Sequence, residues 1–172
     1  AAVLVKPGLM EIREFDLPQP EKGAALCRVL SVGVCGTDKH SYRGETVQYK
    51  GTENEIDLPF PIIQGHEIAM EIVAIDEEAA QNLSFDGDYL KVGDRIICPD
   101  VVCGKCWYCK NMPSYPWCEH LQFSYGNMRS CNDGHHLYGG YAEYVYLEPG
   151  VRAYKIPDGL PNDLACFTEV MC

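Results

Sequence analysis

The sequence lacks the glycine spacing with which many proteins hold a phosphate group. None of its 16 glycines form a Gly-X-Gly pair and none begins a Gly-X-X-X-X-Gly-Lys run, so it contains neither a dinucleotide fingerprint nor a phosphate loop. Basic runs are missing as well, because 14 Lys and Arg residues stand against 25 Asp and Glu residues, giving a formal net charge of −11. Without a basic patch to meet phosphates, the chain is not expected to bind nucleic acid.

Long apolar runs and a secretory signal are also missing. The apolar run at residues 68–75 contains Glu71 and is far shorter than the ~20 residues that a membrane helix needs. The amino end, residues 1–7, is too short for a signal peptide. We therefore expect a cytoplasmic protein without a membrane segment. In that compartment its ten cysteines are expected to bind metal or pack in the core rather than form disulfides.

Long helical patterns are scarce, whereas short β-type segments recur. Seven segments are predicted to be strands, at residues 2–5, 10–15, 25–34, 68–75, 95–102, 141–147 and 152–156. The turns between them are rich in Gly, Pro and Asp, which predicts one mainly β domain over residues 1–172, a barrel or a sandwich. The acidic segments 44–60 and 77–90 are expected to be loops. The carboxyl end alone predicts a helix, with one face formed by Leu164, Phe167 and Met171.

Four thiols lie within sixteen residues, at Cys103, Cys106, Cys109 and Cys118. The first three are separated by two residues each, so one tight loop can bring them together. This set predicts a closed four-thiolate zinc site in a lobe of about residues 98–122. An iron–sulfur cluster is the nearest alternative, but a ferredoxin-type run would place its fourth cysteine at position 113, which is Pro113. A closed site leaves no coordination position open, so this metal is expected to be structural.

A second group of chemically active residues surrounds Cys35. This cysteine follows a predicted strand, and the next five residues add a hydroxyl, a carboxylate and an imidazole. Alone, a cysteine at a strand end is more often a small buried hydrophobe. Further along the chain, Gly65 permits a sharp turn, and His66 and Glu67 after it are both possible zinc ligands. Together these residues indicate a second metal site.

Five ordered segments resemble the motifs of zinc-dependent medium-chain alcohol dehydrogenases. They are Cys35-Gly-Thr-Asp-Lys-His40, Gly65-His66-Glu67, Val92-Gly-Asp-Arg95, the segment from Cys103 to Cys118, and Gly139-Gly-Tyr-Ala-Glu-Tyr144. The resemblance covers nearly the whole chain and implies a GroES-like fold, a partly open β-barrel that forms a catalytic domain. It also implies that a Rossmann domain for NAD or NADP follows near the position where this chain stops. The chain is therefore expected to lack its cofactor domain, and the full-length protein is expected to be a homo-oligomer.

Carried over position by position, the resemblance makes Cys35 and His66 ligands of a catalytic zinc, with Asp38 orienting the His66 ring. Glu67 resembles a carboxylate that lies behind the metal and enters its coordination shell transiently. The third protein ligand is expected at Glu169, the position where sorbitol and threonine dehydrogenases supply a glutamate. Thiolates bind zinc well, so two neighbouring cysteines stay open as alternatives, Cys166 and Cys172.

The reaction that the resemblance implies is the oxidation of a small-molecule alcohol to a carbonyl. The alcohol would react as a zinc-bound alkoxide, and its hydride would pass to NAD or NADP. Thr37 resembles the hydroxyl that contacts the substrate alcohol, and His40 resembles the outer end of a proton relay. Glutamate as the third ligand is typical of the sorbitol and threonine dehydrogenase branch, which favours secondary alcohols, polyols, sugars or threonine-like substrates. No cofactor-binding residue is identified.

Two other function classes stay open from the residues. A non-catalytic GroES-like module, such as a co-chaperonin or a quinone-reductase relative, would need neither Cys35 and His66 nor the four-cysteine lobe. A zinc-ribbon interaction protein would hold one metal rather than two. The number of metal ions bound per chain therefore separates the three hypotheses.

Overall fold

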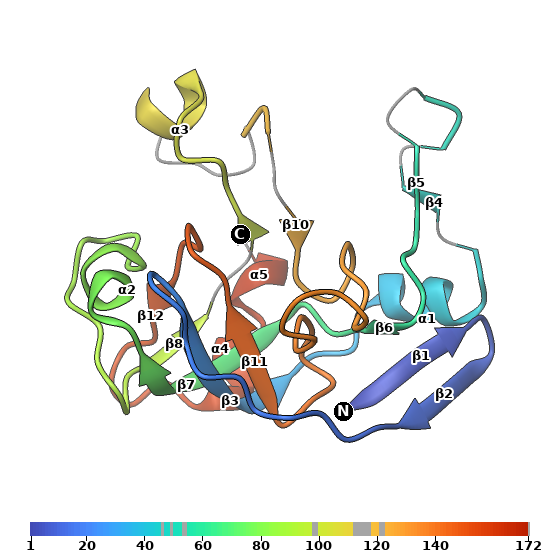
Figure 1. Cartoon of the computed structure of the whole chain (residues 1–172), viewed down its shortest axis with the longest axis horizontal. Coiled ribbons are helices and arrows are strands. Elements are labelled where there is room, and N and C mark those ends of the chain that lie inside the picture. Colours follow the sequence, from blue (N-terminus) through green and yellow to red (C-terminus); the bar gives the residue numbers. More distant parts are fainter. Residues whose placement is uncertain are drawn as a thin grey trace.

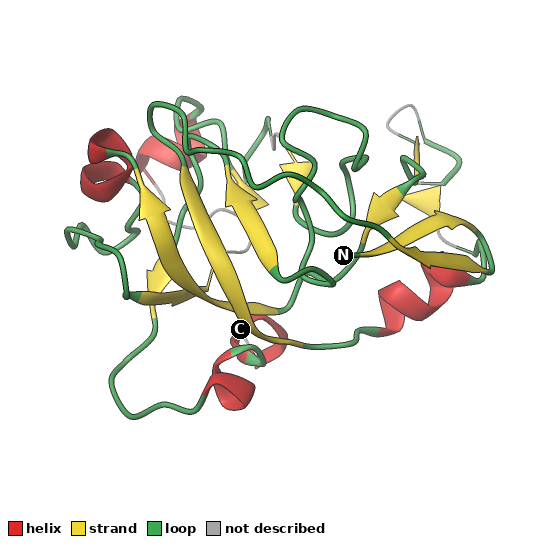
Figure 2. Cartoon of the chain, turned by 60° about the horizontal axis from the view of Figure 1, so that its bottom comes forward, coloured by secondary structure: helices red, strands yellow, loops and turns green. Residues whose placement is uncertain are grey.

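The computed structural model describes residues 1–45, 47–48, 50–52, 55–97, 100–111, 118–120 and 123–171. Their regular structure is mainly strand, joined by turns and a few short helices. Figure 2 shows the strands in the body of the molecule and the helices at its periphery. The mainly β architecture predicted from the sequence is thus confirmed.

A five-stranded antiparallel sheet forms the centre of the fold. Its strands, in spatial order, are β11 (Tyr144–Leu147), β3 (Ala25–Val32), β7 (Ile68–Ile75), β8 (Arg95–Ile97) and β12 (Tyr154–Lys155). β7 has the bounds that the sequence predicts and occupies the middle of the sheet. Its first three residues are all buried, because core side chains cover both faces of the sheet there.

The register of β3 against β7 brings two distant segments together. Val32, the last residue of β3, lies opposite Ile68, the first residue of β7. The Gly33 N–H then donates to the Glu67 carbonyl at 2.9 Å, which extends the pairing by one step. After β3 the chain continues into α1 (Gly36–Tyr42), and the start of α1 lies beside the residues that precede β7. Residues just after β3 therefore lie beside residues just before β7.

Smaller sheets surround the central one. One has the order β2 (Leu9–Ile12), β1 (Ala2–Lys6) and β6 (Ile62–Ile63), and two pairs combine β4 (Val47–Gln48) with β5 (Ile56–Asp57) and β9 (Asp100–Val101) with β10 (Phe123–Ser124). Figure 1 places β1 and β2 at the opposite end of the molecule from β8 and β12. Over the described ranges these sheets do not join into one closed barrel, as expected for a partly open one.

Both segments predicted to be loops contain regular structure, so those predictions were wrong. Residues 44–60 include β4 and β5, and residues 77–90 include α2 (Glu77–Asn82). The side chain of Asp76 caps α2 by accepting a hydrogen bond from the Glu78 N–H. Glu77 and Glu78 also add negative charge to the first helical turn, where the helix dipole favours it. The acidic residues interpreted as a solvated loop thus favour the start of a helix.

Several predicted strands have other bounds in the structure. Residues 10–15 are extended in β2 only as far as Ile12, and residues 152–156 form only the two-residue β12. The predicted strand at 95–102 is divided between β8 and β9, and residues 98–99 lie outside the described part of the chain.

The predicted strand at 141–147 begins only at Tyr144, for a clear reason. Residues 140 and 141 pair with the chain ahead of β7 instead of with β3, although the Glu143 carbonyl still accepts from the Val29 N–H of β3 at 2.9 Å. The Gly140 N–H donates to the Gly65 carbonyl at 2.8 Å, and the Tyr141 N–H donates to the Gln64 carbonyl at 2.9 Å. This side pairing turns residues 139–141 toward the segment that carries His66.

Three tyrosines lie among the fully buried side chains, and each hydroxyl has a hydrogen-bond partner. The Tyr138 hydroxyl donates to Glu148 Oε1 at 2.8 Å, while the Tyr125 hydroxyl accepts from the Glu148 N–H at 3.0 Å. The Tyr146 hydroxyl accepts from the Glu21 N–H at 3.1 Å. Because these polar groups are satisfied, the core can bury large aromatic rings without leaving orphaned hydroxyls.

The predicted carboxyl-terminal helix is divided in two, α4 (Asn162–Ala165) and α5 (Thr168–Met171). Of its described side chains, Ala165 and Cys166 are buried, and they pack with Ala69 and Ile156. The face expected to be apolar is largely exposed instead, at 52% for Leu164, 48% for Phe167 and 75% for Met171. None of the helices in the described ranges is long and apolar enough to cross a membrane.

Arg95 attaches the carboxyl-terminal segment to the central sheet. Its Nη1 donates to the Leu160 carbonyl at 2.8 Å and to Asn162 Oδ1 at 2.7 Å, and its Nη2 donates to the Pro157 carbonyl at 3.0 Å. The Ile156 N–H in turn donates to the Arg95 carbonyl at 2.8 Å. One guanidinium therefore holds the chain that leads into α4 and α5.

We expect Arg95→Met to destabilise the fold by about 1–3 kcal/mol, because three hydrogen bonds from a charged donor are lost while the apolar stem is kept. Thermal and urea unfolding measure this change. Arg28→Met is the matched control, since Arg28 makes an exposed ion pair with Glu71 at 3.2 Å that contributes about 1 kcal/mol or less. Equal losses in the two variants would contradict the role given to Arg95.

Candidate functional site

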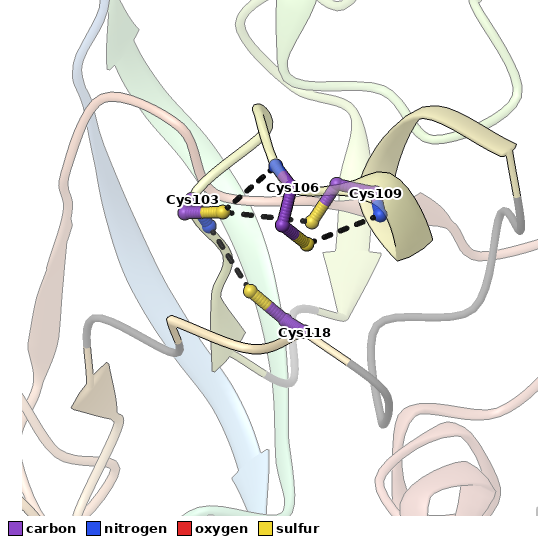
Figure 3. Close-up of side chains that lie close together, drawn as sticks. All are labelled: Cys103, Cys106, Cys109 and Cys118. Carbon is purple, nitrogen blue, oxygen red and sulfur yellow. Dashed lines mark hydrogen bonds between the residues drawn. The ribbon is translucent and has the colours of Figure 1, made fainter.

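The four cysteines of the predicted lobe converge in the structure. The Sγ atoms of Cys103, Cys106, Cys109 and Cys118 all lie within 4.8 Å of one another, and we call this set the four-thiol cluster. Figure 3 shows Cys103 and Cys106 on the loop before α3 (Trp107–Asn111), Cys109 on α3 itself, and Cys118 approaching from the opposite side. The Cys103 and Cys109 sulfurs are 3.9 Å apart, far longer than a disulfide bond.

Backbone amides donate to three of these sulfurs. The Cys106 N–H donates to Cys103 Sγ, the Cys109 N–H to Cys106 Sγ and the Cys103 N–H to Cys118 Sγ, each at 3.4 Å. The backbone N–H of Lys105, together with that of Cys106, lowers the pKa of Cys103 to about 6. Burial in turn raises the pKa of Cys109 to about 12. The Cys103 thiolate therefore forms readily, and a bound cation would balance the negative charge of the other three thiolates. The four sulfurs thus fit a thiophilic divalent metal.

A second cluster lies where β3 and β7 meet. One ligand atom from each of Cys35, His66 and Glu67 lies within 4.8 Å of the others, and we call this set the Cys–His–Glu cluster. His66 and Glu67 are only 8% and 5% exposed, whereas Cys35, just before α1, is partly exposed. The two segments meet because Val32 pairs with Ile68. A buried imidazole and carboxylate beside a more accessible thiol fit a metal site with one side open.

Gly33 is a site residue that the sequence interpretation missed. A Cβ atom added at this position would overlap the Glu67 carboxylate. Only glycine therefore leaves room for Glu67 in its buried position. A glycine next to a predicted strand end is a signal of close approach between segments, but it does not say which side chain approaches.

Asp38 lies beside the Cys–His–Glu cluster and is only 4% exposed. Its Oδ2 accepts hydrogen bonds from the Cys35 N–H and the Tyr141 hydroxyl, both at 2.9 Å. Its Oδ1 accepts from the Gly65 N–H at 3.3 Å and lies 3.8 Å from His66 Nδ1. Burial, and then the charge of Asp38, raise the pKa of Tyr141 above its usual value, so its hydroxyl stays protonated at neutral pH.

Thr37 and His40 both belong to α1 but differ in their surroundings. Thr37 Oγ1 lies 3.7 Å from Cys35 Sγ, so the hydroxyl is beside the Cys–His–Glu cluster. His40 lies one turn later and is exposed, with its Nδ1 2.8 Å from Glu45 Oε2. Hydrogen bonding to His40 lowers the pKa of Glu45. Glu45 is a partner of His40 that the sequence interpretation did not identify.

The residues considered for a third ligand are only partly described. Glu169 belongs to α5, but its side chain lies outside the described residues, as does all of Cys172. Cys166 is 4% exposed, and its thiol donates to the Asp163 carbonyl at 3.1 Å. The Ser31 hydroxyl donates to Cys166 Sγ at 3.6 Å. The choice of Glu169 therefore stays a prediction.

The comparisons with known proteins agree on one family. A model of the alcohol dehydrogenase GroES-like domain matches residues 21–158. An L-threonine 3-dehydrogenase from Thermococcus kodakarensis is 32% identical over 160 residues, which are 92% of this chain and 39% of that protein. The crystal structure of an alcohol dehydrogenase from Thermotoga maritima has a TM-score of 0.80 and 31% identity, covering 97% of this chain and 43% of the other.

A third similar protein is a proposed zinc-binding dehydrogenase from Sinorhizobium meliloti 1021, whose crystal structure is bound to NADP. It has a TM-score of 0.68 and 27% identity, and the match covers 97% of this chain and 41% of the other. The present chain thus spans about two fifths of the length of these relatives.

We expect Gly33→Ala to destabilise the protein by about 1–3 kcal/mol, because the new Cβ displaces the buried Glu67 carboxylate. Gly36→Ala is the control. A Cβ there meets nothing within 4 Å, and alanine favours the first turn of α1, so its stability should be unchanged or slightly raised. Urea unfolding of both variants measures the difference, and a Gly33→Ala protein as stable as Gly36→Ala would show that the close approach to Glu67 is unimportant.

Proposed function

The chain belongs to the zinc-dependent medium-chain alcohol dehydrogenase family, and from this we propose that it forms the metal- and substrate-binding domain of such an enzyme. The family and the GroES-like fold inferred from the sequence motifs are thereby confirmed. The proposed activity is the oxidation of a small-molecule alcohol with NAD or NADP. Because residues 1–172 contain no Gly-X-Gly, we assign the dinucleotide to a separate Rossmann domain.

The observation that carries the proposal is the meeting of Cys35, His66 and Glu67 in one half-buried cluster. We assign a catalytic zinc to Cys35 and His66 of this cluster, with Glu67 behind it as a transient ligand, and a structural zinc to the four-thiol cluster. A zinc ion with an open coordination position supplies Lewis acidity, which lowers the pKa of an alcohol bound to it. A non-catalytic GroES-like module or a zinc-ribbon protein would need no Cys–His–Glu cluster.

The residues around the Cys–His–Glu cluster would bind the alcohol and move its proton. We assign to the Thr37 hydroxyl the acceptance of a hydrogen bond from the substrate hydroxyl, since Thr37 Oγ1 lies beside Cys35 Sγ. His40, one turn along α1 and exposed, would take the proton toward solvent at Nε2 while Glu45 holds its Nδ1. Asp38 would fix the orientation of the His66 ring through Nδ1.

Glu169 is our choice for the third protein ligand of the catalytic zinc. The Cys166 thiol is already engaged with the Asp163 carbonyl and the Ser31 hydroxyl, which supports the choice of glutamate over this cysteine. A glutamate ligand favours the polyol and threonine dehydrogenase branch, which agrees with the similarity to an L-threonine 3-dehydrogenase. The proposed substrates are therefore secondary alcohols, polyols, sugars or threonine-like compounds.

We expect two zinc ions per chain, which elemental analysis of the purified protein measures directly. Cys35→Ser should leave one zinc and nearly the wild-type unfolding temperature. Cys103→Ser should lower the unfolding temperature strongly, because binding to a closed thiolate site contributes free energy to folding. One zinc per wild-type chain, or equal destabilisation by the two variants, would contradict the two roles.

In the complete enzyme that contains this chain, we expect Glu169→Ala to abolish alcohol oxidation and to release one zinc, because the site loses a negatively charged ligand. Cys166→Ala is the matched control from the same segment and should keep both zinc ions and most of the turnover. Initial rates with NAD and NADP, together with zinc content, measure both effects. Loss of zinc in the Cys166→Ala protein alone would make a thiolate the third ligand.

A further inference from the structure

We propose that Tyr141 is a positioning residue of the Cys–His–Glu cluster, whose hydroxyl holds the Asp38 carboxylate in the orientation that faces His66. This inference rests on the proposed function, because it gives His66 the role of a metal ligand. Tyr141 lies 103 positions after Asp38 in the sequence, and its hydroxyl donates to Asp38 Oδ2 at 2.9 Å.

The donors around Asp38 are divided unevenly between its two oxygens. Oδ2 receives the two shorter hydrogen bonds, from the Cys35 N–H and the Tyr141 hydroxyl, both at 2.9 Å. Oδ1 receives one longer bond, from the Gly65 N–H at 3.3 Å. This distribution fixes Oδ2 and leaves Oδ1 with accepting capacity on the side of the imidazole. Without the Tyr141 hydroxyl, Oδ2 keeps only the Cys35 N–H as a donor. The buried Asp38 carboxylate is then held less firmly in this orientation.

His66 is the group that needs this orientation. Its Nδ1 is buried, and within the described residues it has no hydrogen-bond partner. Asp38 Oδ1 lies 3.8 Å from this nitrogen, longer than a hydrogen bond. A histidine that binds a metal through one ring nitrogen is held by the hydrogen bond that its other nitrogen donates. The position of Oδ1 therefore decides how well the ring is held.

The backbone of Tyr141 is fixed from three sides, so its hydroxyl is a rigid donor. The Tyr141 N–H donates to the Gln64 carbonyl at 2.9 Å, and its carbonyl accepts from the Ala2 N–H at 2.7 Å. The preceding Gly140 N–H donates to the Gly65 carbonyl at 2.8 Å. These bonds attach Tyr141 to the turn that leads directly into His66.

The ring of Tyr141 packs against that turn as closely as the backbone allows. A Cβ atom at Gly65 would lie 2.8 Å from Tyr141 Cδ1, so the ring occupies the space that a side chain at 65 would need. Gly139 approaches even closer, since a Cβ there would overlap the Ile63 carbonyl. Phenylalanine at 141 would keep this packing and remove only the hydroxyl, which makes Tyr141→Phe a clean test.

The experiment measures the zinc affinity of each site in Tyr141→Phe and in Tyr138→Phe, by competition with a chelator. Tyr138 is the matched control, because its hydroxyl also donates to a carboxylate, Glu148 Oε1 at 2.8 Å, and Glu148 is not a member of the cluster. We expect Tyr141→Phe to weaken the Cys–His–Glu site about 10- to 100-fold and to leave the four-thiol site unchanged. The visible spectrum of cobalt bound at the Cys–His–Glu site should also change. Tyr138→Phe should alter neither.

Asp38→Asn supplies a second and independent arm. If Tyr141 acts through Asp38, adding Tyr141→Phe to Asp38→Asn should weaken zinc binding little further, because both changes disrupt the same support of the His66 ring. The proposal would be overturned if Tyr141→Phe kept the wild-type zinc affinity and cobalt spectrum. It would also be overturned if Tyr138→Phe lost as much zinc affinity, or if the effects of Tyr141→Phe and Asp38→Asn on zinc affinity were additive. His66→Ala tells whether the role of Tyr141 or the proposed metal site itself is wrong. A protein that keeps both zinc ions after His66→Ala would refute the metal site itself.

Discussion

The antiparallel pairing of β3 with β7 is the constraint on which the Cys–His–Glu cluster depends. Because Val32 lies opposite Ile68, the end of β3 lies beside the start of β7. Cys35, which follows β3, therefore lies close to His66 and Glu67, which precede β7. A slip of one residue would turn every side chain of a strand to the other face of the sheet. The buried start of β7 makes such a slip costly, because core residues such as Ala69 and Met70 would change sides.

Residues 139–141 complete what the strand pairing begins. They leave the expected path of β11 and pair with the turn before His66, which brings the Tyr141 hydroxyl within hydrogen-bond distance of Asp38. Such contact requires glycine at positions 65 and 139, where a Cβ would collide with its neighbours. The site is therefore held by close backbone packing as well as by hydrogen bonds, which suits a metal ligand that must keep a fixed orientation.

The two clusters differ in how much of the fold they require. The four-thiol cluster is assembled from one local segment, and backbone amides of the same segment donate to its sulfurs. The Cys–His–Glu cluster needs the central sheet, α1 and the turn before β7 in place together. This difference agrees with the proposed roles, because a metal in a closed local site can contribute to folding, whereas a reactive metal site benefits from a rigid scaffold. Arg95 extends that scaffold to the segment that carries Glu169.

The sequence by itself determined the family, the mainly β fold, the bounds of β7 and the identity of both clusters, because their motifs are local in the chain. The role of each residue as a metal ligand stays a prediction. Sequence patterns could not reveal the early turn at residues 139–141, since non-local hydrogen bonds decide it. The start of α2 did carry a local signal, the Asp76 cap before two acidic residues, which was interpreted as a loop. Only the tertiary structure showed that Gly33 makes room for Glu67 and that Tyr141 reaches Asp38, because these pairs meet through strand register and close packing rather than through spacing in the sequence.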